Sequence, residues 1–193
     1  DIDWVMDLII KVADEGNMDA LALVDTFGVL SPHAMQYFVR EVKKRVGVRL
    51  ETHFHQDFGM GVANTIMALA EGAEVVHSTV LGLGERAGNT SLAEIVAAIS
   101  DHTNCTTGVN EARLAMISSL VETFSGKNVS ANAPILGTDV FTQTAGIHAD
   151  GDAKGDLYAT RLAPQRFGRE RRYALGKLSG KASLDHNLAR LGI

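Results

Sequence analysis

The sequence predicts an α/β fold with parallel strands in its first half, followed by a mainly helical region. Three segments of strand character alternate with helical segments over residues 1–104. Successive strand and helix units of this kind form parallel sheets through right-handed crossovers. One segment, Ala20 to Val24, is apolar on both faces, as buried parallel strands are. We therefore expect a parallel α/β unit at 1–104 and a second unit at 105–193.

The first elements have clear start and stop signals. Apolar residues recur at helical spacing from Trp4 to Val12, and Glu15-Gly16-Asn17 ends that helix. The strand at Ala20 to Val24 follows. Ser31-Pro32 then supplies an N-cap and an N1 proline for a second helix, whose apolar stripe reaches Val42.

The same alternation continues to residue 99. Residues 46–50 predict a second strand that leads into His53, and residues 62–69 predict a third helix that stops at Glu71. Residues 74–80 predict the third strand. A fourth helix is expected from about Ser91 to Ile99, with Ser91 and Glu94 spaced as a capping box.

The second half is less regular. A helical pattern extends from Leu114 to Phe124 and stops at Gly126, and residues 183–191 predict a closing amphipathic helix. The basic run between them is expected to form a solvated face rather than a binding surface. It consists of Arg166, Arg169, Arg171 and Arg172.

Composition argues against several classes of protein. A net charge of −5 disfavours a nucleic-acid partner, and no apolar run is long enough to span a membrane. The single cysteine, Cys105, excludes an internal disulfide and suits a reducing cytosol. Without a signal peptide, a cytoplasmic location is expected. The chain begins at Asp1 rather than methionine, which suggests a piece of a longer protein.

The pair His53 and His55 is the first sign of chemistry. Two residues apart on a strand, the imidazoles lie on one face, where they could share a metal ion. The alternative is two partly buried histidines that are hydrogen-bonded to their neighbours. Two ligands do not complete a metal site, so the pair alone leaves both readings open.

Three polar loops follow the three expected strands, at residues 25–28, 53–59 and 82–89. The carboxyl ends of parallel strands meet at one edge, where α/β folds place their chemistry. Asn89 could add an amide oxygen to the two imidazoles, a donor set that suits zinc, manganese or magnesium. Thr26 brings a hydroxyl suited to a carboxylate. Glu85 and Arg86 could form a loop salt bridge or act directly.

Four segments of the chain form an ordered set of motifs. They are Asp25-Thr26-Phe27-Gly28, His53-x-His55-x-Asp57-x-Gly59, the loop Gly84 to Asn89, and Ala145 to Gly151 with His148 at its centre. In order and spacing they resemble the acyl-CoA-dependent Claisen-condensing synthases, the family of 2-isopropylmalate, homocitrate and citramalate synthases. The resemblance covers nearly the whole chain.

That resemblance implies a fold and a first set of site residues. It implies that residues 1–104 are the last three βα units of a (β/α)8 TIM barrel, strands six to eight, and that strands one to five lie outside this sequence. It further implies that His53 and His55 ligate a divalent metal, that Asn89 lies at or near it, and that Thr26 binds the carboxylate of a 2-oxo acid. A third ligand, an aspartate of the first strand, is absent here.

The same resemblance assigns catalysis to the second unit. It implies that His148 reaches the partner subunit's active site in a homodimer and takes part in acid/base chemistry, with Tyr158 assisting. We add Glu85 as a catalytic candidate in the glycine-flanked loop. The implied reaction is a metal-dependent condensation of acetyl-CoA with a 2-oxo acid.

Several functions remain open within this frame. The first choice is condensation with 2-oxoisovalerate to give 2-isopropylmalate, a step of leucine biosynthesis. Homocitrate and citramalate synthesis are alternatives, because the residues that size the 2-oxo acid pocket lie mostly outside the sequence. A hydroxymethylglutaryl-CoA lyase-like enzyme is disfavoured because residues 82–89 contain no cysteine. The last alternative is a non-catalytic, truncated dimerisation module.

Overall fold

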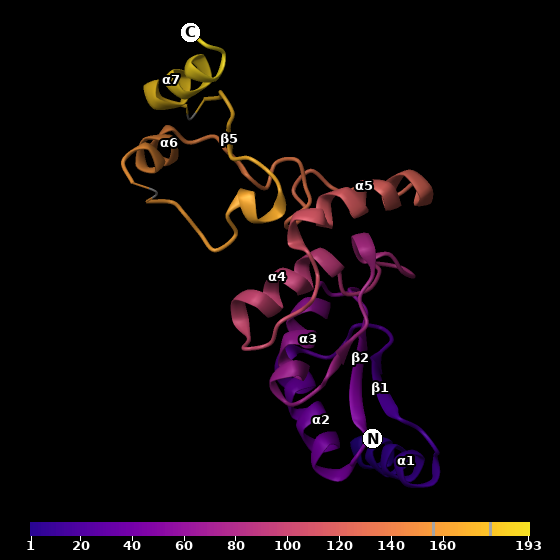
Figure 1. Ribbon diagram of the computed structural model, residues 1–193. Coiled ribbons are helices and arrows are strands. Elements are labelled where there is room, and N and C mark those ends of the chain that lie inside the picture. Colours follow the sequence, from indigo (N-terminus) through magenta and orange to yellow (C-terminus); the bar gives the residue numbers. More distant parts are fainter. Residues whose placement is uncertain (156, 178) are drawn as a thin grey trace. The chain divides into compact units, whose positions relative to one another are not determined.

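The computed structural model describes residues 1–155, 157–177 and 179–193, and it divides into two compact units (Figure 1). The first unit is Asp1–Gly108 and the second is Val109–Ile193. The sequence had placed this boundary at residue 104. No helix among the described residues is long and apolar enough to cross a membrane.

The first unit alternates strands and helices from its start to residue 102. Each helix begins or ends where the sequence supplies a signal; for example, the Ser31 hydroxyl accepts the Ala34 backbone N–H at 3.3 Å. The elements are α1 (Ile2–Glu15), β1 (Ala20–Asp25), α2 (Pro32–Arg45), β2 (Arg49–Phe54), α3 (Gly61–Ala70), β3 (Val75–Val76), a 3₁₀ turn η1 (Val80–Gly82) and α4 (Leu92–His102).

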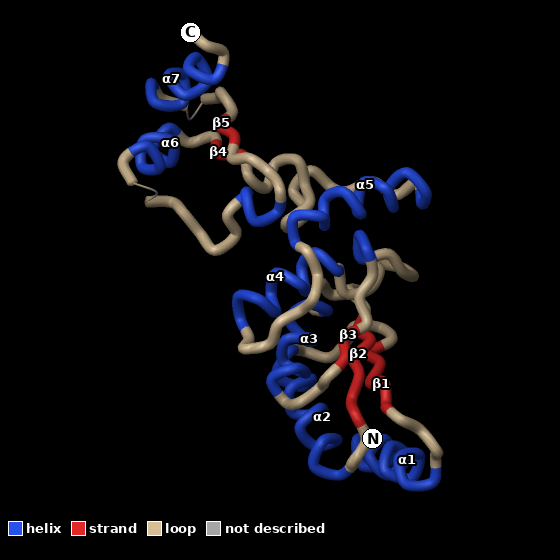
Figure 2. Tube along the Cα trace, in the orientation of Figure 1, coloured by secondary structure: helices blue, strands red, loops and turns tan. Residues whose placement is uncertain are grey.

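The three strands form one parallel sheet in the order β1-β2-β3, with Val24 opposite His53 (Figure 2). The predicted parallel α/β arrangement is thus confirmed. The third strand is shorter than expected, because pairing with β2 ends at Val76. Beyond it, Thr79 pairs with Ser91 instead, and the chain turns into η1.

The core of this unit lies between the sheet and its helices. Leu23, Leu50 and Phe54 point from the strands into this layer, and α2 adds Met35, Val39 and Val42. Because side chains alternate along a strand, the next residues of β2, Glu51 and His53, lie on the opposite face. On that face Val24 is 53% exposed. One face of the sheet is therefore packed, while the other carries the polar candidates.

The fourth helix begins differently from the predicted capping box. Ser91 is the N-cap of α4, but its side chain accepts no backbone N–H. It hydrogen-bonds to the Glu94 carboxyl instead; burial raises the pKa of Glu94, and this bond opposes the rise. The spacing was right, but the serine bonds to the acid rather than to the backbone.

The second unit is mainly helical and contains a small parallel pair of strands. The predicted helices near 114–124 and 183–191 are present, and Gly126 ends the first of them in the left-handed conformation. The segment around His148 forms a helix that periodicity did not predict. The elements are η2 (Glu111–Arg113), α5 (Leu114–Ser125), β4 (Thr142–Gln143), α6 (Gly146–Ala153), η3 (Pro164–Phe167), β5 (Arg172–Tyr173) and α7 (Lys181–Arg190).

The prediction of a solvated arginine face is wrong for three of its four members. Arg166 binds the Glu111 carboxylate, with Nη2 and Oε1 2.7 Å apart. Arg169 donates to the backbone carbonyls of Ile135 and Leu136, both at 3.0 Å. Arg171 pairs with the Asp152 carboxylate, and only Arg172 is exposed. These arginines bind partners within the unit, which a charge run cannot reveal.

Candidate functional site

The loops that follow the three strands of the first unit meet at one edge of the sheet. His55 and Asn89 form an antiparallel bridge, and the Gln56 backbone N–H donates to the Gly88 carbonyl at 3.0 Å. The His55 backbone N–H also donates to the Asp25 carbonyl at 3.3 Å. Three segments that are far apart in sequence are thereby joined through their backbones.

The two histidines of the candidate metal site lie side by side. The ring centroids of His53 and His55 are 5.4 Å apart, and the ring planes make an angle of 65°. His55 is only 9% exposed, and its Nδ1 atom is buried without a hydrogen-bond partner. Neither imidazole forms a side-chain hydrogen bond with another described residue. The alternative interpretation, two histidines that are hydrogen-bonded to their neighbours through their side chains, is therefore not observed among the described residues.

Electrostatics favour the neutral form of His53. Burial lowers the pKa of His53, and the neighbouring His55 and His77 lower it further. A neutral imidazole has a free lone pair and is the form that binds metal ions. This ring is therefore in the protonation state that a ligand needs.

Asn89 supplies a second unsatisfied atom next to His55. Its Nδ2 donates to the Leu83 carbonyl at 3.0 Å, which fixes the orientation of the amide. Its Oδ1 is buried and has no hydrogen-bond partner. Buried polar atoms without partners are costly, and an ion is one explanation for them. His55 Nδ1 and Asn89 Oδ1 fit a divalent metal that accepts mixed nitrogen and oxygen ligands.

The described residues do not complete such a site. Among them, no three His, Cys, Asp or Glu side chains are grouped closely enough to hold a metal ion. A site built on His53, His55 and Asn89 therefore needs a further ligand.

Arg86 joins the loops of this edge through its side chain. Its guanidinium binds both oxygens of Asp57, at 2.8 and 3.1 Å, and it also donates to the Thr26 carbonyl. It lies over the ring of Phe27, 5.2 Å from the centroid. The hydrogen bond from Arg86 lowers the pKa of Asp57. The sequence did not single out Asp57 for this role.

Glu85 forms only a minor contact in this arrangement. Its carboxylate is 3.3 Å from Arg86 Nη1, and the side chain is 84% exposed. The expected pair between Glu85 and Arg86 exists, but Asp57 is the bidentate partner of Arg86. Most of the Glu85 side chain is therefore open to solvent.

The Thr26 loop is shaped by its neighbours. The buried Asp25 carboxylate accepts the backbone N–H groups of Val29 and Leu30, at 3.1 and 3.0 Å. Gly28 has φ +60°, and a Cβ there would lie 2.9 Å from the His55 carbonyl oxygen. Glycine is therefore required for this close approach. The Thr26 side chain remains exposed at the edge.

In the second unit, His148 and Tyr158 lie together. Their ring centroids are 4.4 Å apart, and His148 Nδ1 is hydrogen-bonded to Gln143 Oε1. A Cβ on Gly151 would lie 2.5 Å from the Tyr158 ring, so glycine makes room for the tyrosine. Because a carbonyl oxygen only accepts, Nδ1 carries the hydrogen, and Nε2 has the lone pair in the neutral ring. Gln143 was not predicted as a partner.

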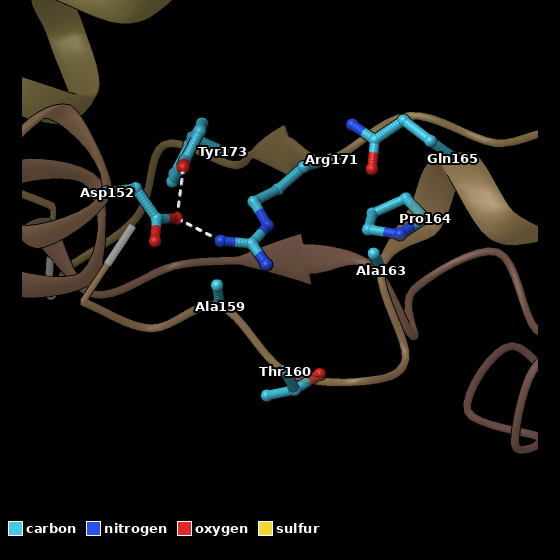
Figure 3. Close-up of a pocket in the computed structure, with 8 residues that line it drawn as sticks. All are labelled: Asp152, Ala159, Thr160, Ala163, Pro164, Gln165, Arg171 and Tyr173. Carbon is cyan, nitrogen blue, oxygen red and sulfur yellow. Dashed lines mark hydrogen bonds and ion pairs between the residues drawn. The ribbon is translucent and has the colours of Figure 1, made fainter. Parts of the chain in front are cut away.

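A cavity of about 320 Å³ lies beside α6 in the second unit (Figure 3). On one side, the Asp152 carboxylate binds both Arg171 and the Tyr173 hydroxyl, the latter at 2.5 Å. Burial alone would raise the pKa of Asp152, but these two bonds outweigh it and lower the pKa. The cavity is also lined by Ala159, Thr160, Ala163, Pro164 and Gln165.

Comparison with known proteins gives one family and several relatives. The sequence pattern of the family described as HMGL-like matches residues 2–121. A putative (R)-citramalate synthase CimA of Methanopyrus kandleri is 40% identical over 93% of this chain and 36% of that protein. A 2-isopropylmalate synthase of Methanocaldococcus jannaschii is 37% identical over 100% of this chain and 37% of that protein. Homocitrate synthase AksA of Methanothermobacter thermautotrophicus is 37% identical over 100% of this chain and 49% of that protein.

Two solved structures share the fold over 67% and 63% of the chain. An HMG-CoA lyase of Bacillus subtilis has a TM-score of 0.59 and 25% identity, over 67% of this chain and 45% of that one. The carboxyl transferase domain of Rhizobium etli pyruvate carboxylase has a TM-score of 0.57 and 21% identity, over 63% and 20%. The chain thus spans less than half the length of these proteins and of the relatives above.

Proposed function

The chain belongs to the HMGL-like family, and from that membership we propose that it is part of a metal-dependent acyltransferase that condenses acetyl-CoA with a 2-oxo acid. Within this proposal, the first unit contributes the last three βα units of a (β/α)8 barrel. The enzyme acts in the cytoplasm as a homodimer. The observation that carries the proposal is the pair of unsatisfied buried atoms, His55 Nδ1 and Asn89 Oδ1, at the strand edge.

His53, His55 and Asn89 would hold the divalent metal, which is manganese, magnesium or zinc. When bound, such an ion polarises the carbonyl of a 2-oxo acid as a Lewis acid. The protein's own part is to present the two imidazoles unbonded and close together, and to fix the Asn89 amide through Leu83. A ligand from outside the described residues completes the set.

Thr26 would orient the substrate. Its exposed hydroxyl can donate to the carboxylate of a 2-oxo acid, and its backbone is held by Arg86. Arg86 also binds Asp57, two residues beyond His55. The loop that carries Thr26 and the loop that follows His55 are therefore fixed to each other. Such positioning lowers the entropic cost of bringing the reacting carbons together.

His148 would act as the acid/base residue. The Gln143 carbonyl oxygen keeps the hydrogen on Nδ1, so Nε2 is free to take a proton from the methyl group of acetyl-CoA. The adjacent Tyr158 hydroxyl could return a proton to the oxygen of the product. In this proposal His148 serves the partner subunit's site, and the exposed Glu85 is a further catalytic candidate in the loop after the third strand.

The identity of the 2-oxo acid is the finer part of the proposal. We keep 2-oxoisovalerate, which would give 2-isopropylmalate for leucine biosynthesis, as the first substrate to test. Pyruvate and 2-oxoglutarate are its rivals, because relatives named as citramalate and homocitrate synthases reach similar identities, 40% and 37%.

The test is release of free thiol from acetyl-CoA by the full-length gene product, with each 2-oxo acid in turn. We expect turnover with one acid, and loss of at least a hundredfold when His53 and His55 are both changed to alanine, about the size expected when catalytic electrostatics are removed. His102→Ala serves as control, because His102 is an exposed residue at the C-terminal end of α4. Activity that survives the double change would contradict the metal assignment.

A further inference from the structure

A carboxylate and an imidazole form a hydrogen-bonded pair beside the candidate ligand His53. Glu51 stands two residues before His53 on β2, so both side chains lie on the same face of the sheet. Glu51 Oε2 and His77 Nε2 are 2.9 Å apart. Because a carboxylate only accepts, the His77 Nε2–H group donates, and this bond fixes the His77 ring.

The fixed His77 ring packs against His53. Their centroids are 5.6 Å apart, with an angle of 78° between the ring planes, which is an edge-to-face contact. His53 also meets His55 in an edge-to-face contact at 5.4 Å. His53 has no side-chain hydrogen bond to a described residue, so these two ring contacts help to set its orientation.

His77 is not itself grouped with the two candidate ligands. Among the described residues, no three titratable side chains form a metal-holding group, so His53, His55 and His77 are not one set of ligands. The charged group that also faces Glu51 is Arg49, whose Nη2 is 3.7 Å from Glu51 Oε1 and whose side chain is 50% exposed. Arg49 therefore competes only weakly for Glu51.

We propose that Glu51 and His77 are positioning residues for the metal ligand His53. Glu51 holds the His77 ring, and His77 holds the His53 ring so that its nitrogen faces the ion. This inference rests on the metal site of the proposed function. Groups that orient metal ligands typically contribute ten- to a hundredfold to metal affinity. Because Glu51 and His77 act through ring packing rather than through a bond to His53, we expect an effect of about tenfold on metal affinity, the lower end of that range.

The test is Zn²⁺ affinity of the purified full-length gene product by isothermal titration calorimetry, at a fixed pH of about 7.5, above the ordinary histidine pKa of about 6.5. Glu51→Ala and His77→Ala should each weaken binding about tenfold. The double variant should be no weaker than His77→Ala alone, since Glu51 acts only through His77. Glu74→Ala is the matched control, because Glu74 is 53% exposed and paired with Lys43.

A conservative variant separates positioning from general damage to the fold. His77→Phe keeps an aromatic ring beside His53 and removes the hydrogen bond that holds it, so it should weaken Zn²⁺ binding no more than Glu51→Ala does and should make binding insensitive to Glu51→Ala. Additive losses in the double variant would instead mean that Glu51 acts on the ion by its charge, and would overturn the inference.

Two other results distinguish this inference from the proposed function. If Zn²⁺ binding depends on His53 and His55 but is unchanged in Glu51→Ala and His77→Ala, the positioning role is wrong while the metal site stands. If the wild-type protein binds no Zn²⁺, the metal site itself is wrong, and the positioning role falls with it.

Discussion

The two units of this chain are stabilised in different ways. In unit 1 (residues 1–108), aliphatic and aromatic side chains from the sheet and α2 form one continuous core that includes Leu50 and Phe54. In unit 2 (residues 109–193), arginines bind partners inside the fold: Arg166 binds Glu111, Arg169 binds backbone carbonyls, and Arg171 binds Asp152.

Unit 1 is thus stabilised mainly by apolar burial, whereas unit 2 combines buried apolar residues such as Phe167 with arginine contacts. Apolar burial is non-directional and tolerates many sequences, whereas a buried ion pair is costly to break because one charge is left unpaired. The proposed chemistry follows the same division. The candidate metal ligands stand at the edge of the sheet, while His148 stands on a short helix held by polar contacts.

The largest effect is expected from Phe54→Ala in unit 1. Phe54 is 1% exposed and lies in the core beside α2. The change should reduce the free energy of unfolding by about 3–5 kcal/mol, measured by urea denaturation followed by circular dichroism. Phe124→Ala in unit 2 is the control, because Phe124 is 79% exposed. Equal losses in the two variants would show that unit 1 does not depend on this core.

The next largest effect is expected from Asp152→Asn in unit 2. The Asp152 side chain is 9% exposed, and its carboxylate holds both Arg171 and Tyr173. Removing its charge leaves Arg171 unpaired and should cost about 3 kcal/mol of unfolding free energy. Asp150→Asn should change little, because Asp150 is 49% exposed and pairs with Lys154 on the helix surface. A small loss in both would contradict a charge-dependent unit 2.

The sequence predicted unit 1 far better than unit 2, for physical reasons. Apolar periodicity and caps are local, so the helices and parallel strands of residues 1–102 follow from them directly. The exception, β3, is short because Thr79 pairs with Ser91, a non-local choice. In unit 2 the contacts that matter join charges distant in sequence, such as Glu111 and Arg166, and no period marks them.

The candidate site was predictable in kind but not in its supporting contacts. The spacing of His53 and His55, and the position of Asn89 after the next strand, were enough to predict that they share one edge. The partners Asp57, Glu51 and His77 were missed. A signal existed for Glu51, which shares the strand face of His53, but its pairing with His77 depends on the register between β2 and β3.

The smallest effect concerns an exposed pair in unit 1. Glu71 accepts hydrogen bonds from Arg40 at 2.9 and 2.6 Å and from Gln36 at 2.8 Å. The bond from Arg40, followed by that from Gln36, lowers the pKa of Glu71 from 4.5 to about 2. A carboxyl whose pKa is depressed by folding stabilises the fold above its unfolded pKa, and this contribution disappears as the pH falls through the folded value.

The free energy of unfolding of the wild type should therefore exceed that of Glu71→Gln above pH 4.5, and the difference should shrink as the pH falls to about 2. Urea denaturation at a series of pH values measures it. Glu74→Gln is the control, because Glu74 is 53% exposed beside Lys43 and its pair is weak. Because Arg40 is 46% exposed, solvent screens this pair far more than the pair of Asp152 and Arg171. A difference that stays constant with pH would show that Gln36 and packing, rather than the charge of Glu71, join α2 to α3.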